Sequence, residues 1–293
     1  MEDILTALAS RLKQKDNSAN KGTNGTLTVA AGSELYRGAA ALASSAALRC
    51  GVGIVRLVSV EKVISSAAAR LPECVFLPTE SENGAMSYRD FARKMPAFSK
   101  SRAVLAGCGM TDCADTGNII AELIKYGGYQ LIIDADGLNS IKNRPELLKS
   151  AALPPVITPH IGEMSRLTGA STDAIKSDRE KTAAEFSRKY NCITVLKDCK
   201  TVISSPEGKL FVCDRPNAGL AKGGSGDVLS GIISSFAAQG YDAFDAAVCG
   251  TALHSLAAES AREKLTEDSM LPSDIVAEIP GVFARIGKTR NYR

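Results

Sequence analysis

The chain has 293 residues, of which 45% are hydrophobic and 23% are charged. This length suits one large α/β domain or two small ones, and the hydrophobic content is ample for a buried core. The formal net charge of +3 is too small to indicate nucleic acid or a membrane surface as a partner. Trp is absent and aromatic residues make up 5%, so no stacking platform for single strands is indicated.

The cysteines and histidines limit the metal and redox chemistry. The eight cysteines form no C-x-x-C pair or zinc-like spacing, and the chain has only two histidines. We therefore predict no metal-ligating set among the side chains. Residues 1–21 are polar and charged and lack a signal-peptide core, and the apolar stretch 38–58 is interrupted by Arg49 and Arg56. We expect a reduced, cytoplasmic protein with no membrane span.

Strands and helices alternate along the predicted chain. An amphipathic helix over 1–16 is followed by a strand (27–31), an Ala-rich helix (38–49) and a strand (54–58), which form a βαβ unit. This unit implies a parallel sheet with right-handed crossovers. Residues 88–101 give no clear prediction. The later predicted strands are 103–106, 131–135, 156–158 and 193–196, then a hairpin of 201–204 and 210–213. The later predicted helices are 118–126, 161–167, 172–190, 228–238, 243–260 and 273–285.

The segment that most clearly indicates a ligand site is 217–229, which lies between a predicted strand and a predicted helix. It holds four glycines and Lys222, and Asp227 falls in the first helical turn. Glycines permit sharp turns, and free N–H groups at a helix start bind anions. A carboxylate beside such a site can deprotonate a hydroxyl for phosphoryl transfer. The alternative is structural: Ser225 caps the helix and Asp227 only complements its dipole.

Small or polar residues also follow strand after strand, where ligands of parallel sheets gather. They are Gly32, Gly107–Gly109, Asp134–Asp136, His160 and Lys197. Each allows two interpretations. His160 either caps a helix or binds a ligand. The Asp134–Asp136 segment either forms a capped turn, or holds Mg²⁺ through water or positions a ligand. Lys197 is either a surface lysine or a phosphate ligand.

Together these segments resemble a known family, the ADP/ATP-dependent NAD(P)H-hydrate dehydratases, which have a ribokinase-like fold. The resemblance runs from about Lys21 to His254. It includes Thr158-Pro159-His160 with Gly162-Glu163, which is specific, and the glycine-rich segment with Asp227, which also occurs in the wider kinase superfamily. The other matching segments are Lys21-Gly22 with Gly25, Ala31-Gly32-Ser33, Gly38-Ala39-Ala40, Ala47-Leu48-Arg49, Gly51-Val52-Gly53, Asp134 to Asn139 and Val195-Leu196-Lys197.

The resemblance implies a fold and a reaction. The fold is a three-layer αβα sandwich around a mostly parallel central sheet, as a single domain over 1–293. The reaction repairs nicotinamide nucleotides: the S epimer of hydrated NADH or NADPH is phosphorylated on its ring hydroxyl by ADP or ATP, and loss of phosphate restores NAD(P)H. It also implies Mg²⁺, a separate NAD(P)H-hydrate epimerase chain in the same pathway and a homotetramer.

The resemblance also implies roles for residues. Asp227 is the catalytic base. The substrate-binding residues are Ala39, Gly109, His160 and Asp227. The nucleotide-binding residues are Lys197, Asp198, Cys199, Lys200, Thr201, Gly224, Ser225 and Gly226. The chain departs from the family pattern at Asn20 (usually His), Cys108 (often Pro) and Asp198 (usually Gly), and the carboxylate of Asp198 is expected to disfavour a phosphate nearby.

Two alternative functions stay open at this point. A kinase for a small alcohol, such as a vitamin or sugar, would use the same anion site and base, but the Thr158-Pro159-His160 segment argues against it. A nucleotide-binding protein without catalysis would not need an intact segment from Gly223 to Asp227.

Overall fold

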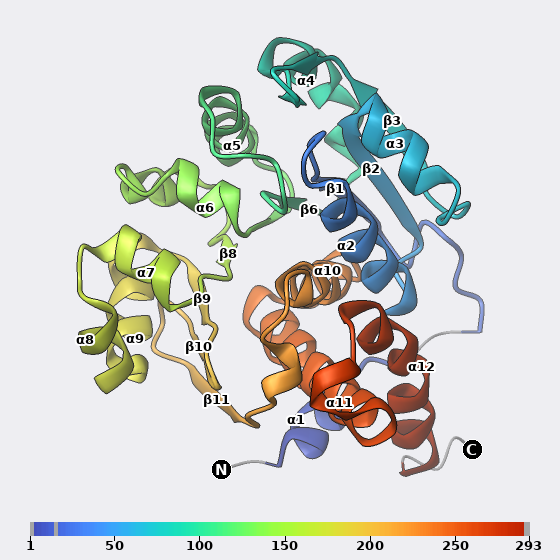
Figure 1. The fold of residues 1–293 in the computed structure, drawn as a ribbon, viewed down its shortest axis with the longest axis vertical. Coiled ribbons are helices and arrows are strands. Elements are labelled where there is room, and N and C mark those ends of the chain that lie inside the picture. The colour runs from blue at the N-terminus through green and yellow to red at the C-terminus, as the bar shows by residue number, and fades with distance from the viewer. Residues whose placement is uncertain (1–2, 15–16, 290–293) are drawn as a thin grey trace.

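The computed structural model describes residues 3–14 and 17–289. Within these residues, nine strands form one sheet in the order β11-β10-β9-β8-β7-β6-β1-β2-β3 (Figure 1). Neighbouring strands from β3 to β9 are parallel, and β10 is antiparallel to both β9 and β11. The strands are β1 (Thr26–Ala30), β2 (Ile54–Val60), β3 (Val75–Thr79), β6 (Ala103–Ala106), β7 (Gln130–Ile133), β8 (Val156–Ile157), β9 (Ile193–Leu196), β10 (Lys200–Ser204) and β11 (Leu210–Asp214).

The strand order reverses beside β1. The chain first runs outward from β1 through β2 to β3, then returns to β6 on the other side of β1 and runs outward again to β9. Such a reversal opens a crevice beyond the carboxyl ends of the two central strands, where α/β proteins bind ligands. Here those ends carry Gly32, after β1, and Cys108, after β6, and the Gly32 N–H donates to the Cys108 carbonyl at 2.8 Å.

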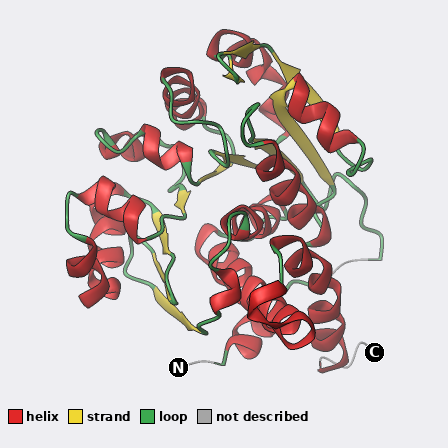
Figure 2. Ribbon diagram, in the orientation of Figure 1, coloured by secondary structure: helices red, strands yellow, loops and turns green. Residues whose placement is uncertain are grey.

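Helices cover both faces of the sheet (Figure 2), as the three-layer prediction required. On one face lie α1 (Ile4–Arg11), α2 (Arg37–Arg49), α3 (Glu61–Ala68), α10 (Ser225–Ala238), α11 (Ala243–Ser269) and α12 (Pro272–Thr289). On the other lie α4 (Tyr88–Lys94), α5 (Ala114–Tyr126), α6 (Asp136–Ser140), α7 (Ile161–Thr168), α8 (Thr172–Ser177) and α9 (Arg179–Tyr190). Among the described residues, no helix is long and apolar enough to cross a membrane.

Close helix packing holds α10 between α2 and α11. A Cβ atom on Gly231 of α10 would lie 2.2 Å from the Ala43 carbonyl oxygen of α2. A Cβ atom on Gly250 of α11 would lie 2.4 Å from the Ile233 side chain of α10. Only glycine permits these approaches. The three helices therefore pack backbone to backbone, and α10 is fixed above the centre of the sheet.

Most predicted elements are confirmed, including the hairpin of β10 and β11. The single helix predicted over 172–190 is wrong: it is broken at Asp178, whose side chain accepts from the Lys181 N–H at 3.1 Å and caps α9. The predicted first helix is shorter, and its ends at 1–2 and 15–16 lie outside the described residues. The helix predicted to end at 260 continues to a kink at Thr266, whose φ is +67°, and a short last turn reaches Ser269.

Several short elements were not predicted. They are α3, α4, β3, the small hairpin of β4 (Ser81–Glu82) and β5 (Ala85–Met86), and the 3₁₀ turns η1 (Met95–Lys100), η2 (Pro145–Ser150) and η3 (Ala218–Leu220). Strand β3 is at the sheet edge, contains Pro78 and buries only Thr79 well. Its sequence therefore shows neither an apolar run nor strict alternation, the two patterns that predict strands.

Candidate active site

The start of α10 has the backbone geometry that can bind an anion. Gly224 caps this helix with φ +101°, so Ser225 is not the cap and its side chain makes no capping bond. The Ser225 N–H donates to the Lys222 carbonyl, and the Val228 N–H makes the first bond of the helix, to Gly224. In the described part of the chain, the N–H groups of Gly226 and Asp227 have no partner. Two free amides at the positive end of the helix dipole suit a phosphate.

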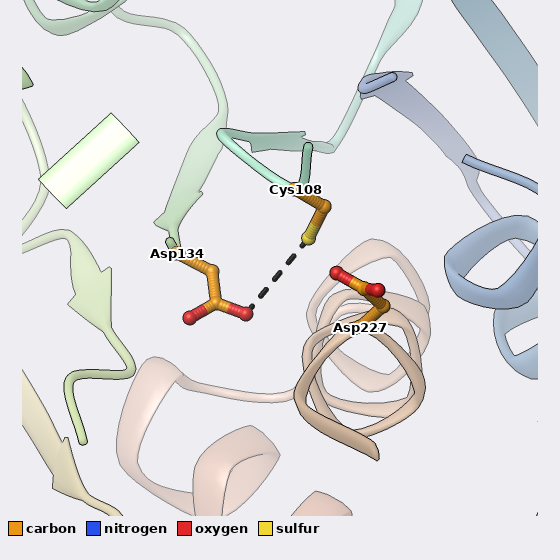
Figure 3. A group of neighbouring side chains, drawn as sticks. All are labelled: Cys108, Asp134 and Asp227. Atoms are coloured by element: carbon orange, nitrogen blue, oxygen red, sulfur yellow. Dashed lines mark hydrogen bonds between the residues drawn. The ribbon is translucent and has the colours of Figure 1, made fainter. Parts of the chain in front are cut away.

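Asp227 lies in the first turn of α10, as predicted, and faces Cys108 and Asp134 (Figure 3). One potential ligand atom from each of these three residues lies within 4.8 Å of the other two. Burial and the nearby charge of Asp134 raise the pKa of Asp227 to about 6, although a hydrogen bond with Cys108 opposes the shift. Asp227 is therefore a stronger base than an exposed aspartate, and it is ionised at neutral pH.

A buried ion pair lies beneath this site. The Lys197 Nζ atom, after β9, lies 2.8 Å from Oδ1 of Asp134, after β7. The Ser230 hydroxyl donates to Oδ2 of Asp134 at 2.6 Å, and the Cys108 thiol lies 3.8 Å from the same atom. Burial alone would raise the pKa of Asp134, but Lys197 and Ser230 hold it below its usual range. Asp134 therefore carries a negative charge that Lys197 balances.

Lys197 is not a surface lysine, so that alternative is wrong. Burial alone would lower its pKa, but Asp134 and Glu163 raise it above its usual value. A Cβ atom on Gly226 would lie 3.3 Å from Nζ, so the ammonium group lies directly below the free amides of α10. Its charge can therefore attract a phosphate without leaving Asp134.

The backbone after β7 is strained where it brings Asp134 and Asp136 into the site. Ala135, between them, has φ +48° and ψ −118°, a conformation that a residue with a side chain rarely adopts. Asp136 then accepts the Thr111 N–H at 2.8 Å. Such strain persists only where the surrounding structure enforces it, and it is found most often at functional sites.

His160 caps α7. Its Nδ1 atom accepts the N–H groups of Gly162 at 3.0 Å and Glu163 at 3.2 Å, and the Glu163 carboxylate accepts the His160 N–H at 2.8 Å. Because Nδ1 accepts, neutral His160 carries its proton on Nε2. His160 also lines the cavity described next, and burial and the charge of Lys197 lower its pKa. The cap and a ligand role are thus compatible.

A cavity of about 860 Å³ opens between the carboxyl ends of β9 and β11, the amino end of β10, the start of α10 and one face of α11. Of the predicted nucleotide-binding residues, those that line it are Lys197, Asp198, Cys199, Thr201, Gly224, Ser225 and Gly226. Lys200 is not among its lining residues, since its Nζ atom pairs with Asp214 across the hairpin at 2.7 Å. The cavity has the volume of a small-molecule site.

Ala39 and Gly109 adjoin each other outside this cavity. A Cβ atom on Gly109 would lie 2.9 Å from the Ala39 Cβ atom and 2.7 Å from that of Tyr36. Gly109 follows Cys108, which contacts Asp227. These two residues, which are predicted to bind substrate, thus adjoin the Asp227 carboxylate through Cys108.

Two charged residues near the cavity have protein partners that the sequence did not reveal. Arg179 donates to Asp198 through both Nε, at 2.8 Å, and Nη2. Burial alone would raise the pKa of Asp198, but this pairing holds it below its usual range. The negative charge of Asp198, which was expected to disfavour a phosphate, is therefore balanced by Arg179. Lys222 donates to the carbonyls of Glu267, Asp268 and Met270 and fastens the glycine-rich loop to the end of α11.

The cluster of Cys108, Asp134 and Asp227 does not suit Mg²⁺. This ion prefers oxygen ligands, whereas burial and the neighbouring carboxylates raise the pKa of the Cys108 thiol well above its usual value and keep it protonated. Both oxygens of Asp134 are also engaged, by Lys197 and Ser230.

These features define a ribokinase-like α/β protein with free amides at a helix start and a buried, basic carboxylate beside them. The chain belongs to the NAD(P)H-hydrate dehydratase family, whose model matches residues 27–281. The ADP-dependent (S)-NAD(P)H-hydrate dehydratase of Xanthomonas campestris is 30% identical over 97% of both chains. A crystal structure of the ADP/ATP-dependent NAD(P)H-hydrate dehydratase of Bacillus subtilis, co-crystallised with ATP and Mg²⁺, has a TM-score of 0.82 at 26% identity and covers 95% of this chain and 96% of its own.

Other relatives are longer. The bifunctional NAD(P)H-hydrate repair enzyme Nnr of Thermofilum pendens is 32% identical over 92% of this chain, which covers 54% of that protein. The chain thus spans about half the length of such bifunctional relatives.

Proposed function

We propose that the chain is an ADP- or ATP-dependent dehydratase acting on the S epimer of hydrated NADH or NADPH. The observation that carries this proposal is the position of Asp227, a base with a pKa of about 6, next to two free amides at a helix start. The Xanthomonas and Bacillus relatives, which are named for this activity, support it.

The first step is a phosphoryl transfer. Asp227 takes the proton of the substrate's ring hydroxyl, and the oxygen attacks the terminal phosphorus of the nucleotide while the bond to the leaving nucleotide oxygen breaks. The amides of Gly226 and Asp227 and the charge of Lys197 stabilise the negative charge on the transferring group. The Ala39 and Gly109 surface binds the hydrated dinucleotide so that its hydroxyl reaches Asp227.

The second step removes phosphate. Hydroxide is a poor leaving group and phosphate a good one, so the carbon–oxygen bond breaks with the electron pair leaving on phosphate. The ring nitrogen supplies electrons, and a proton lost from the adjacent carbon restores the double bond of the dihydronicotinamide. The net result is loss of water from the substrate and cleavage of one phosphoanhydride bond.

Further expectations from the family resemblance belong to this proposal. Mg²⁺ would enter with the nucleotide, since this ion usually binds substrate phosphates together with few protein groups. The proposal also includes a cytoplasmic homotetramer that works beside a separate NAD(P)H-hydrate epimerase.

The deciding experiment follows the absorbance band of reduced nicotinamide. The protein is mixed with hydrated NADH, Mg²⁺ and either ADP or ATP. We expect the absorbance to rise with at least one nucleotide and to stay constant without nucleotide. If a folded, nucleotide-binding protein gives no rise with either, the function is wrong, and phosphorylation of a small alcohol becomes the better explanation.

The pH dependence tests the role of Asp227 as base. Only its ionised form accepts a proton, and its pKa is raised to about 6. We therefore expect kcat/KM to be level above pH 7 and to fall about tenfold per pH unit below pH 6. Initial rates at constant ionic strength measure this profile. A level profile down to pH 5 would contradict the assignment.

The Arg179–Asp198 pair gives a separate prediction for nucleotide affinity. In Arg179→Ala, the Asp198 carboxylate that lines the cavity loses its partner. We expect the KM for ADP or ATP to rise about threefold to tenfold with little change in kcat, because a free anion repels phosphate. The double variant Arg179→Ala/Asp198→Gly should restore the KM. If it does not, the effect of Arg179 does not come through Asp198.

A further inference from the structure

Cys108 lies where the basic carboxylate and the buried ion pair meet. Its side chain is fully buried, and its Sγ atom points between the carboxylates of Asp134 and Asp227 (Figure 3). Burial and the charges of these two carboxylates raise the pKa of the thiol well above its usual value, so the thiol keeps its proton. With a single proton, it donates to one of the two carboxylates at a time.

Of the two carboxylates, Asp227 depends more on this proton. The oxygens of Asp134 already accept hydrogen bonds from Lys197 at 2.8 Å and from Ser230 at 2.6 Å. The Cys108 thiol forms a hydrogen bond with Asp227 as well, and among the described residues no other group donates to that carboxylate. Because a buried carboxylate without a donor is costly, the thiol proton stabilises the protein most when it is directed at Asp227.

The backbone on both sides of Cys108 fixes the place of its side chain. Gly107 has φ +121°, and a Cβ atom on it would lie 1.9 Å from the Asp134 carbonyl oxygen. Gly109 has φ +61°, and the Cys108 carbonyl between the two glycines accepts the Gly32 N–H at 2.8 Å. Both φ values lie in the region that favours glycine. Cys108 is therefore held in a tight turn, and its Sγ atom stays beside Asp227.

We propose that Cys108 is a positioning residue, whose thiol holds one oxygen of Asp227 and leaves the other free for the ring hydroxyl of the substrate. This assignment rests on the proposed function, because that function makes Asp227 the base. Cys108 stands where the family pattern often has Pro, which offers no side-chain donor. The role therefore belongs to this chain and goes beyond the family pattern.

A titration of Asp227 tests the hydrogen bond without any substrate. Carbon-13 NMR of its carboxyl carbon, assigned with Asp227→Asn, gives its pKa in wild type and in Cys108→Ala. We expect the pKa to rise by about half to one pH unit in Cys108→Ala, because a hydrogen bond to the charged form favours that form. The other charged groups that act on Asp227 are Asp134, Asp136 and Lys197, and the substitution leaves all three in place.

Kinetics with hydrated NADH test the positioning. At pH 8 we expect Cys108→Ala to lower kcat about threefold to thirtyfold, because the carboxylate loses the bond that orients it. The fall of kcat/KM at low pH should begin about half to one pH unit higher than in wild type. Cys108→Ser supplies a hydroxyl donor, so it should restore kcat to within about threefold of wild type and return the pKa to the wild-type value or below.

Cys50→Ala is the matched control. Cys50 is also buried, but it follows the last residue of α2, at the end of that helix away from Ala39. The inference is wrong if Cys108→Ala leaves either the pKa of Asp227 or kcat at the wild-type value. It is also wrong if Cys108→Ser behaves like Cys108→Ala, or if Cys50→Ala causes the same changes.

The two readouts separate this inference from the proposed function. An unchanged pKa of Asp227 in Cys108→Ala, in a protein that dehydrates hydrated NADH, would overturn the inference and leave the proposed function standing. Conversely, the expected pKa shift in a protein that does not dehydrate hydrated NADH would confirm the hydrogen bond and overturn the proposed function.

Discussion

Asp227→Asn is expected to lower kcat by at least about 10²-fold to 10⁴-fold while ADP and ATP still bind, because the amide cannot accept the hydroxyl proton. The free N–H groups of Gly226 and Asp227 belong to the backbone and survive the substitution. Turnover of hydrated NADH and calorimetric binding of ADP measure the two effects. Activity near that of wild type would rule out Asp227 as the base.

The same substitution should stabilise the protein at neutral pH. A carboxyl group whose pKa rises from 3.8 when unfolded to about 6 when folded opposes folding above that range. Below pH 3.8 both states are protonated and the cost vanishes; above pH 6 the cost is complete. We expect Asp227→Asn to raise the free energy of unfolding by about 2 to 3 kcal/mol at pH 7.5, and by little near pH 4. Denaturant unfolding at both pH values checks this; equal effects at both would show that the raised pKa is not the cause.

Lys197→Met is expected to destabilise the fold by about 3 to 5 kcal/mol, because Asp134 keeps a buried charge without its partner. The loss should shrink at low pH, where Asp134 can take up a proton. The double variant Lys197→Met/Asp134→Asn removes both charges and should recover most of the stability. Urea unfolding of the three proteins gives the free energies.

Lys200→Met is a matched control for this experiment. Lys200 pairs with Asp214 at 2.7 Å, but the two side chains are 50% and 32% exposed, so water screens this pair much more than the buried one. Such a pair contributes about 0.2 to 1 kcal/mol. If Lys197→Met lowers the free energy of unfolding no more than Lys200→Met does, the charge of Asp134 does not depend on Lys197.

The strand ends could be predicted from the sequence because their signal is local. An apolar run that stops at a glycine, an aspartate or a lysine marks both the strand and the residue beyond it, as at Asp134 and Lys197. Which of these residues meet depends on strand order, so the Asp134–Lys197 pair, across 63 positions, had no local signal. The proximity of Cys108 to Asp227 was missed for the same reason.

Other residues near the site were not predicted because their sequence patterns are common in residues with a structural role. Thr251 and His254 lie in a helix that is buried along most of its length, where a lone polar residue is usually structural. Arg179 is the first residue of α9, but the prediction joined α8 and α9 into one helix over 172–190. The contact of Arg179 with Asp198 could therefore not be predicted. The substrate roles of Ala39 and Gly109 stay predictions; the structure places these residues against each other.

The glycine contacts of α10 have a consequence for motion. Gly231 and Gly250 bring backbone against neighbouring helices, so α10 has no room to shift toward α2 or α11 when a ligand arrives. Its amides and Asp227 therefore hold the same geometry in the free and bound protein, and their ordering is complete once the chain has folded. Any rearrangement on binding must therefore come from parts of the site other than α10. The part of the site proposed to hold phosphate is therefore in place before any ligand arrives.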